Sequence, residues 1–354
     1  GAANTLTQPG AATDAAGQAV GSLSSTRAEA KTASASAGGA SFSTTAGVTF
    51  QPDVPATATS SLVVAPALVL ANGVAVATIT ATERDQFGNP VPGAPVALAA
   101  TGSGNTLAQP AGPTDAAGEA QGALASTVAE AKTVSATTGA TAVGTAQDVT
   151  FQPGPAASLT LTAQPVTGMA GVTLAALTVA ASDAFGNATA LPGQATVSLL
   201  AAPPGAALGG TTTAGGASTA SFTDLLLVRA GDYRLRVTSG GLGVDGAAFT
   251  VAPAAPAALA FSAAPAAPVE AGAAFTAAVE VRDAFDNLTG SSAAVDLSLA
   301  APGTLSGTAS RAAVAGLASF PGLSVDLAGD NALVATSPEK GAGGWRDQDD
   351  IVYI

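Results

Sequence analysis

The side chains that could bind a metal ion or take part in chemistry recur in a short motif, Asp-x-Phe-x-Asn, that occurs three times. It reads DQFGN at 85–89, DAFGN at 183–187 and DAFDN at 283–287, so its Asp recurs after 98 and then 100 residues. Carboxylate and amide oxygens suit Ca²⁺, and a calcium site is one interpretation. The other is a turn, because Asp and Asn accept local backbone hydrogen bonds and Gly tolerates a positive φ. One carboxylate in each of the first two motifs, and two in the third, are too few for a tight metal site, so we favour the turn.

The motif residues are therefore expected to have structural roles. The predicted turn formers are Asp85, Gly88, Asn89, Asp183, Gly186, Asn187, Asp283 and Asn287. The aromatic rings of the three motifs are expected to be buried, as packing residues of the domain cores and not as ligand platforms. These rings belong to Phe87, Phe185 and Phe285.

The chain offers no candidate catalytic or cofactor-binding residues. It contains no His and no Cys, which removes imidazole acid-base catalysis, thiol nucleophiles, disulfides and the usual zinc sites. The segment GLGVDG at 241–246 formally matches a dinucleotide-binding pattern. It lies between two expected strands and no helix follows it, so we interpret it as a hairpin loop. We expect a protein that is not an enzyme and that holds no cofactor or metal.

The charge distribution argues against nucleic acid as a partner. The formal net charge is −13, and the 11 Lys and Arg residues are spread over 354 residues without a basic cluster. Nucleic-acid binding needs a positive surface that displaces counterions from phosphates.

The most apolar stretch, residues 61–81, approaches the length of a membrane-spanning helix. Pro66 and the Asn72-Gly73 pair interrupt it, so two strands joined by a turn fit it better. No basic start followed by an apolar run is visible at the first residues, and no membrane span or signal peptide is expected within this chain.

An internal repeat predicts the architecture. Residues 4–36 match residues 105–137 without a gap, and VTFQP at 48–52 recurs at 149–153, so the period is 101 residues. This period is far longer than that of solenoid or propeller repeats, and each unit should be a complete domain.

Each unit has the pattern of a two-sheet antiparallel sandwich. The 42 Gly and 22 Pro residues would interrupt long helices, and about seven strand candidates separated by turn signals appear in the second unit. Tyr233 stands at the start of a late strand, the place of the tyrosine that bonds back to the backbone at the corner of immunoglobulin-like sandwiches. The predicted fold is all-β, with tandem immunoglobulin-like antiparallel β-sandwich domains arranged as an extended rod.

Pro-rich segments at the ends of the repeats mark the expected domain boundaries. They give domains at 53–153, 154–252 and 253–338. Residues 1–52 align only with the second half of a unit, and we expect a truncated domain with exposed strand edges and poor order. Residues 339–354 have no counterpart in the repeat and receive no assignment.

One full unit carries a family resemblance. RDQFGNPVPGAPVALAATGSGNTL at 84–107, TDAAGEAQGALAST at 114–127 and AKTVSAT at 131–137 resemble the bacterial Ig-like group 1 repeats of the invasin and intimin family. Residues 154–338 are similar to related bacterial Ig-like modules but lack the Asn-Pro-Val-Pro-Gly continuation. The resemblance implies an extended rod on the bacterial cell surface, anchored in the outer membrane or secreted, that presents a terminal adhesive domain. No lectin-like or Cys-bearing tip is visible in this chain.

Three functions are compatible with these features. The first is a structural stalk or spacer: strands that rise about 3.3 Å per residue would give sandwiches roughly 30–35 Å long and a total reach on the order of 100 Å. The second is an adhesive module that recognises a host or neighbouring-cell surface protein or glycan through interstrand loops, although an aromatic content of 4% gives it little support. The third is a set of accessory modules of a larger secreted enzyme. The sequence indicates no oligomeric state.

Overall fold

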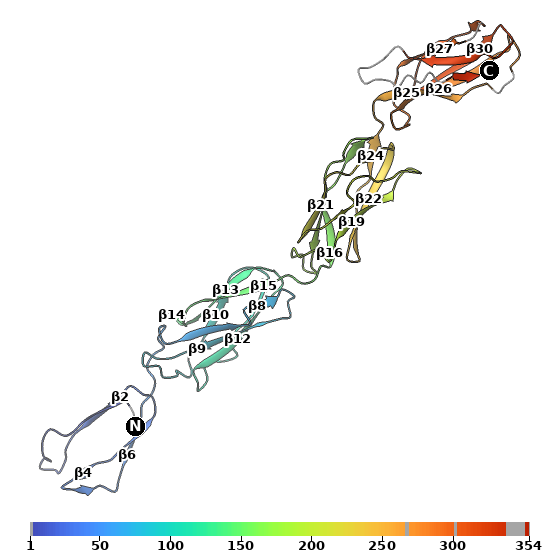
Figure 1. Ribbon diagram of the computed structural model, residues 1–354. Coiled ribbons are helices and arrows are strands. Elements are labelled where there is room, and N and C mark those ends of the chain that lie inside the picture. The colour runs from blue at the N-terminus through green and yellow to red at the C-terminus, as the bar shows by residue number, and fades with distance from the viewer. Residues whose placement is uncertain (1–2, 266–268, 301–302, 338–350, 354) are drawn as a thin grey trace. The chain divides into compact units, whose positions relative to one another are not determined.

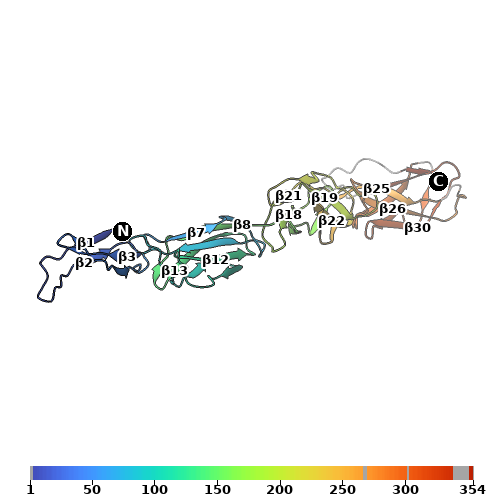
Figure 2. The same ribbon diagram turned by 90° about the horizontal axis from the view of Figure 1, so that it is seen from below.

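The computed structural model describes residues 3–265, 269–300, 303–337 and 351–353. Within these residues the regular structure consists of β-strands and includes no helix, as Figure 1 and Figure 2 show. None of the described segments is therefore a helix that could cross a membrane. The predicted all-β fold is confirmed.

Sandwich one comprises two sheets between residues 61 and 152. One sheet has the order β11-β12-β9-β7, and the other has the order β10-β13-β15-β8 with β14 beside β13. Its strands are β7 (Ser61–Ala65), β8 (Leu68–Leu70), β9 (Ala77–Thr82), β10 (Ala97–Ala100), β11 (Asn105–Ala108), β12 (Glu119–Ser126), β13 (Ala131–Thr138), β14 (Thr141–Ala142) and β15 (Gln147–Gln152). All pairs are antiparallel except β8 with β15.

The core of sandwich one follows from the two-residue period of its strands. In β9 the side chains of Ala77, Ile79 and Ala81 are buried, while the threonines between them face outward. The buried residues of this core all come from residues 62–151, so the sandwich covers its apolar faces by itself.

The apolar stretch 61–81 holds three strands, so the prediction of two strands was wrong. Pro66 separates β7 from β8, and the Asn72 side chain caps the turn before β9 by accepting the backbone N–H groups of Val74 and Ala75. β7 and β8 belong to different sheets, because the chain crosses between the two layers at this point.

Sandwich two has sheets of order β16-β18-β21 and β17-β24-β22-β19-β20, with β23 beside β22. Its strands are β16 (Ser158–Ala163), β17 (Thr167–Met169), β18 (Leu177–Ser182), β19 (Ala195–Ala201), β20 (Thr213–Ala214), β21 (Thr219–Phe222), β22 (Gly231–Ser239), β23 (Leu242–Asp245) and β24 (Phe249–Ala252). Leu177, Val179 and Leu235 lie in its core. The expected loop at 241–246 is largely strand β23, and the turn that precedes it is made by Gly240 and Gly241, both with positive φ.

Sandwich three has sheets of order β25-β26-β30-β28 and β29-β27-β31-β32. Its strands are β25 (Pro256–Ala263), β26 (Phe275–Asp283), β27 (Ala294–Leu299), β28 (Leu305–Ser306), β29 (Ser310–Ala312), β30 (Leu317–Val325), β31 (Ala332–Thr336) and β32 (Ile351–Tyr353). Val279, Phe320 and Leu333 lie in its core. Of the unassigned tail, 339–354, only the backbone of β32 is among the described residues.

Residues 3–52 repeat the strand pairing of sandwich one without its core. β1 (Asn4–Thr7) pairs with β2 (Ser22–Ser25), β3 (Ala30–Ala33) with β6 (Ala46–Thr49), and β4 (Ser36–Ala37) with β5 (Ala40–Ser41). These registers are those found 101 residues later. The segment has the strands of half a sandwich, and an apolar face stays uncovered: Val48 is 42% exposed, whereas its counterpart Val149 is 1% exposed.

The chain divides into two compact units. The first comprises residues 1–155 together with 183–187, and the second comprises residues 156–182 and 188–354. The second motif, 183–187, therefore groups with the residues that precede it and not with the rest of sandwich two. The four expected domain boundaries stay a prediction.

Candidate functional site: the Asp-x-Phe-x-Asn junctions

The three motifs form the same turn, organised by the Asp carboxylate. Oδ1 of Asp183 accepts the backbone N–H groups of Phe185 and Asn187, both at 2.9 Å. The matching bonds to Asp85 and Asp283 measure 2.8–2.9 Å. The motif is thus a closed Asx-type turn, in which an Asp side chain satisfies nearby backbone donors.

The fourth position of the motif lies in the left-handed region. Its φ is 84° at Gly88, 86° at Gly186 and 68° at Asp286. Glycine adopts this conformation at no steric cost, and Asp is among the few other residues that tolerate it.

The second carboxylate oxygen of each Asp holds the linker that leads into the same sandwich. Oδ2 accepts a backbone N–H from Asp53 at 3.1 Å, from Gly154 at 2.9 Å and from Ala254 at 2.8 Å in the three successive motifs. The Pro-rich linker is therefore fixed at one point by the motif that lies about thirty residues after it.

The Asn side chain of each motif reaches the loop before a late strand of the preceding domain or half domain. Asn187 donates from Nδ2 to the carbonyl of Thr127 and accepts at Oδ1 from the N–H of Ala129, both at 2.9 Å. The same two bonds join Asn89 to Thr26 and Ala28 at 2.9 Å, and Asn287 to Val228 and Ala230 at 2.8 Å. We call each backbone pair, a carbonyl and the N–H two residues later, a docking loop.

Asp and Asn of each motif are also bonded to one another. The Asn Nδ2 donates to the Asp Oδ2 at 2.7 Å in the first motif, 2.9 Å in the second and 2.8 Å in the third. The side chain that holds the linker and the side chain that holds the docking loop therefore act as one network.

The Asp carboxylates are saturated with hydrogen bonds. Asp183 accepts four: two from the turn, one from Gly154 and one from the Asn187 side chain. Burial alone would raise the pKa of Asp183, but these donors outweigh it and lower the pKa from 3.8 to about 2. The pKa values of Asp85 and Asp283 are lowered for the same reasons. A carboxylate has about four acceptor positions, so a Ca²⁺ ion could bind only by replacing one of these bonds.

The prediction that the motif phenylalanines fill the domain cores was wrong. Phe87, Phe185 and Phe285 are 54%, 51% and 42% exposed. The Asp of each motif is buried instead, because its oxygens must meet the turn and linker donors, and the cores are already filled by strand side chains. The Phe285 ring lies against Gly171 of sandwich two, where any Cβ would collide with it.

Tyr233 is buried in sandwich two at the start of β22. Its hydroxyl donates to the carbonyl of Arg229 at 2.7 Å, and its ring stacks on Phe249 with a centroid distance of 6.0 Å. Burial raises the pKa of this hydroxyl. The bond ties the start of β22 to the docking loop that Asn287 occupies.

A buried lysine supports the docking loop of sandwich one. Lys132 Nζ pairs with Glu130 at 2.6 Å and donates to the carbonyl of Ser103 at 2.7 Å. Its hydrogen bond to Glu130 lowers the pKa of that carboxyl. Lys31 and Glu29 repeat the pair in the half sandwich.

The comparisons with known proteins identify one part of the chain. Residues 59–152 match the family model of the bacterial Ig-like domain, group 1. No curated protein sequence matches significantly.

Solved structures similar to the chain include three bacterial proteins. The adhesin FdeC of Escherichia coli is 18% identical, with a TM-score of 0.48, over 86% of this chain and 99% of that one. InvD of Yersinia pseudotuberculosis is 21% identical, with a TM-score of 0.43, over 82% and 87%. Invasin, described as a bacterial integrin-binding protein, is 17% identical, with a TM-score of 0.46, over 95% and 69%.

Proposed function

Because residues 59–152 form a bacterial Ig-like domain of group 1, we propose that the chain is a non-catalytic stalk segment of a bacterial cell-surface or secreted protein of the adhesin type. In this role the chain bears mechanical force and sets the distance between the cell surface and the domain that it presents. Recognition of a host or neighbouring-cell protein or glycan belongs to another part of the assembly.

The observation that carries this proposal is the threefold repetition of one junction. At each junction the Asn side chain contributes two hydrogen bonds to a docking loop, and the Asp side chain contributes one to the linker. Two bonds to a donor and an acceptor on the same loop restrain the orientation of the Asn side chain on that loop as well as its distance. At about 1 kcal/mol for each net hydrogen bond, a junction gains on the order of 3 kcal/mol, which favours the state in which the motif is bound to its loop and linker.

The test measures whether a junction is rigid and whether its Asn makes it so. Because the chain contains no Cys, a single pair of labels can be introduced at exposed strand positions on either side of the third junction, as Ser198→Cys and Ser298→Cys. Pulsed electron spin resonance then gives the distance distribution. A stalk requires a narrow distribution that becomes clearly broader in the Asn287→Ala variant.

The control variant is Asp224→Ala, which removes hydrogen bonds to Thr211 inside sandwich two and leaves the junction untouched. Its distribution should stay narrow. A distribution that is already broad in the native chain would contradict the stalk role, and saturable binding of the full chain to host cells or a glycan panel would favour an adhesive module instead.

A further inference from the structure

Sandwich three carries a docking loop of the same construction as those of the other domains. AGDN at 328–331 corresponds to AGDY at 230–233, 98 residues earlier. Gly231 and Gly329 have φ values of 138° and 143°, so the two loops share an unusual backbone conformation. The bond from Gly171 N to the Leu227 carbonyl also recurs, from Gly272 N to the Val325 carbonyl.

The last residue of this segment differs between the two sandwiches, but one hydrogen bond of its side chain is kept. Asn331 stands in the place of Tyr233, and its Nδ2 donates to the carbonyl of Leu327 at 2.9 Å, as the tyrosine hydroxyl does to the carbonyl of Arg229. The correspondence places the carbonyl of Asp326 and the N–H of Ala328 at the positions of the two groups that Asn287 binds in sandwich two.

These two backbone groups have no hydrogen-bond partner among the described residues. The docking loops at Thr26 and Ala28, at Thr127 and Ala129, and at Val228 and Ala230 are all occupied by an Asn side chain. The loop of sandwich three therefore presents the same acceptor and donor without the ligand that the other three hold.

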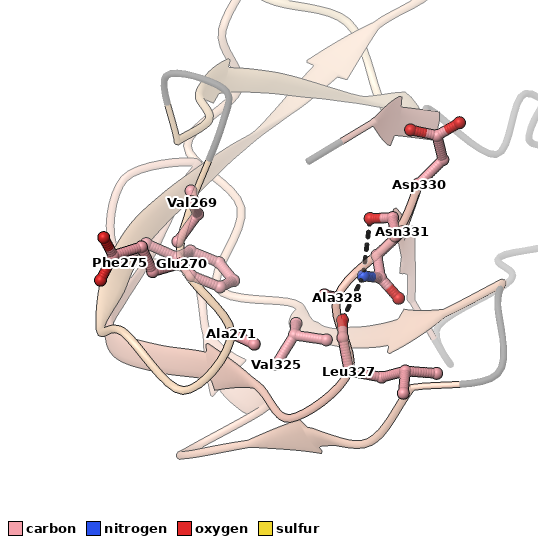
Figure 3. Close-up of a pocket in the computed structure, with 10 residues that line it drawn as sticks. Val269, Glu270, Ala271, Phe275, Val325, Leu327, Ala328, Asp330 and Asn331 are labelled. Carbon is pink, nitrogen blue, oxygen red and sulfur yellow. Dashed lines mark hydrogen bonds between the residues drawn. The ribbon is translucent and has the colours of Figure 1, made fainter.

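A cavity of about 320 Å³ lies beside this loop (Figure 3). Its apolar wall would receive an aromatic ring, and the carboxylates of Glu270 and Asp330 lie on opposite sides of it. At the third junction, Phe285 packs against Gly171, the counterpart of Gly272 next to this cavity. The lining includes Val269, Glu270, Phe275, Val325, Leu327 and Asn331.

We propose that this cavity and loop are a binding site for the Asp-x-Phe-x-Asn turn of a separate Ig-like domain whose motif is not already docked. The Asn of that turn donates to the Asp326 carbonyl and accepts from the Ala328 N–H, and its Phe ring enters the cavity. The ligand is thus defined by the chemistry of the three occupied loops in this chain. The inference goes beyond the stalk role, because it assigns a partner to a surface outside the three junctions.

The probe for this site is the isolated segment 53–153. Its core is complete within residues 62–151, and without residues 1–52 its motif at 85–89 is undocked. Circular dichroism should first establish that the segment is folded. Titration of the unlabelled segment into the ¹⁵N-labelled full chain should then shift the Ala328 amide resonance progressively, and the Ala230 amide, which is already bonded to Asn287, should not move.

Two variants test the assignment from opposite sides. Asn89→Ala in the probe should weaken binding at least tenfold, whereas Asn72→Ala, which alters a turn elsewhere in the same segment, should leave it unchanged. In the full chain, Ala271→Trp adds a ring to the cavity from an exposed position and should abolish the shift, while Ala274→Trp, at an exposed position outside the lining, should not. The proposal would be overturned if the Ala328 amide resonance did not shift at millimolar concentrations of the probe. It would also be overturned if the Asn89→Ala probe bound as tightly as the native probe. Either result would leave the three junctions inside the chain as they are.

Discussion

Asn187 and Asp183 share a hydrogen bond of 2.9 Å between their side chains, and this bond joins two otherwise separate sets of contacts. Asp183 accepts hydrogen bonds from its own turn and from the linker. Asn187 accepts one hydrogen bond from the docking loop and donates one to it. Substitution of either residue should therefore weaken the contacts of both the linker and the docking loop.

Replacing Asn187 by Ala should open the second junction without unfolding sandwich one. The substitution leaves the N–H of Ala129 and the carbonyl of Thr127 without their partners, a loss of about 1–3 kcal/mol if water does not reach them. We expect hydrogen exchange to speed up at Ala129 and at Gly154, with core amides of β9 unchanged. Unaltered protection at Ala129 would contradict the role given to Asn187.

Acid should release the second junction only at low pH. The folded-state pKa of Asp183 is about 2, below its ordinary 3.8, because hydrogen bonds to the carboxylate outweigh the opposing effect of burial. A depressed pKa means that the contribution of Asp183 to stability is complete above about pH 4 and is lost as the pH falls through about 2. An NMR titration of the Asp183 carboxyl should give the low midpoint, and a midpoint near 3.8 would show that the carboxylate is not held by these donors.

Gly186→Ala should cost about 1 kcal/mol of stability through the backbone alone. Gly186 has a φ of 86°, and a Cβ built there meets no atom within 4 Å, so strain and not collision sets the cost. Gly215 in the same sandwich also has open space around it but no positive φ, and Gly215→Ala should be neutral or slightly stabilising. Chemical denaturation of the two variants side by side measures the difference, and equal values would refute the strain argument.

Tyr233→Phe should destabilise sandwich two by about 1 kcal/mol. It removes the hydroxyl that donates to Arg229 and keeps the ring that stacks on Phe249. Tyr233→Ala also removes the ring from the core and should cost roughly 3–5 kcal/mol. Equal unfolding free energies for the Phe variant and the native chain would indicate that the hydroxyl bond contributes nothing.

The repeat itself provides a matched pair of core and surface substitutions. Val149 is buried in sandwich one, whereas Val48, its counterpart 101 residues earlier, is exposed. Val149→Ala should cost about 2 kcal/mol because it removes buried methyl groups, and Val48→Ala should change stability by less than about 0.5 kcal/mol. A large effect at Val48 would mean that the half sandwich is covered in solution.

The strands of sandwich one could be predicted from sequence because their pattern is local. Only β8 and β14 were missed between residues 61 and 153. The predicted strand candidates all overlap strands of the structure and lie at 61–65, 74–83, 94–100, 104–108, 118–125, 131–137 and 148–153. β8 is three residues long and sits inside a longer apolar run, and β14 has two residues, so neither shows a period of two. The strand registers of residues 3–52 are the same as those found 101 residues later, in keeping with the similar sequences of the two stretches.

The interactions of the motif could be predicted only in part. Its turn is local, so Asp, Asn and the residue with positive φ identify it. The bonds from Asn187 go to backbone groups of Thr127 and Ala129, and almost every residue type can supply such groups, so the motif alone did not predict its partners. The prediction that the Phe rings are buried in the domain cores was wrong for a related reason. An aromatic residue in a short motif indicates that the ring packs, but not which surface it packs against.

The Asn of every motif binds backbone groups, and this has a consequence for how the number of domains in such chains changes during evolution. The Asn side chain binds only backbone groups of the docking loop, so these two hydrogen bonds place no demand on the side chains of that loop, although the Phe ring of the third motif does need a glycine at 171. Duplication or loss of a whole unit can then keep the hydrogen bonds of each junction, and unequal recombination between the similar stretches 4–36 and 105–137 is one way in which arrays of different length would arise.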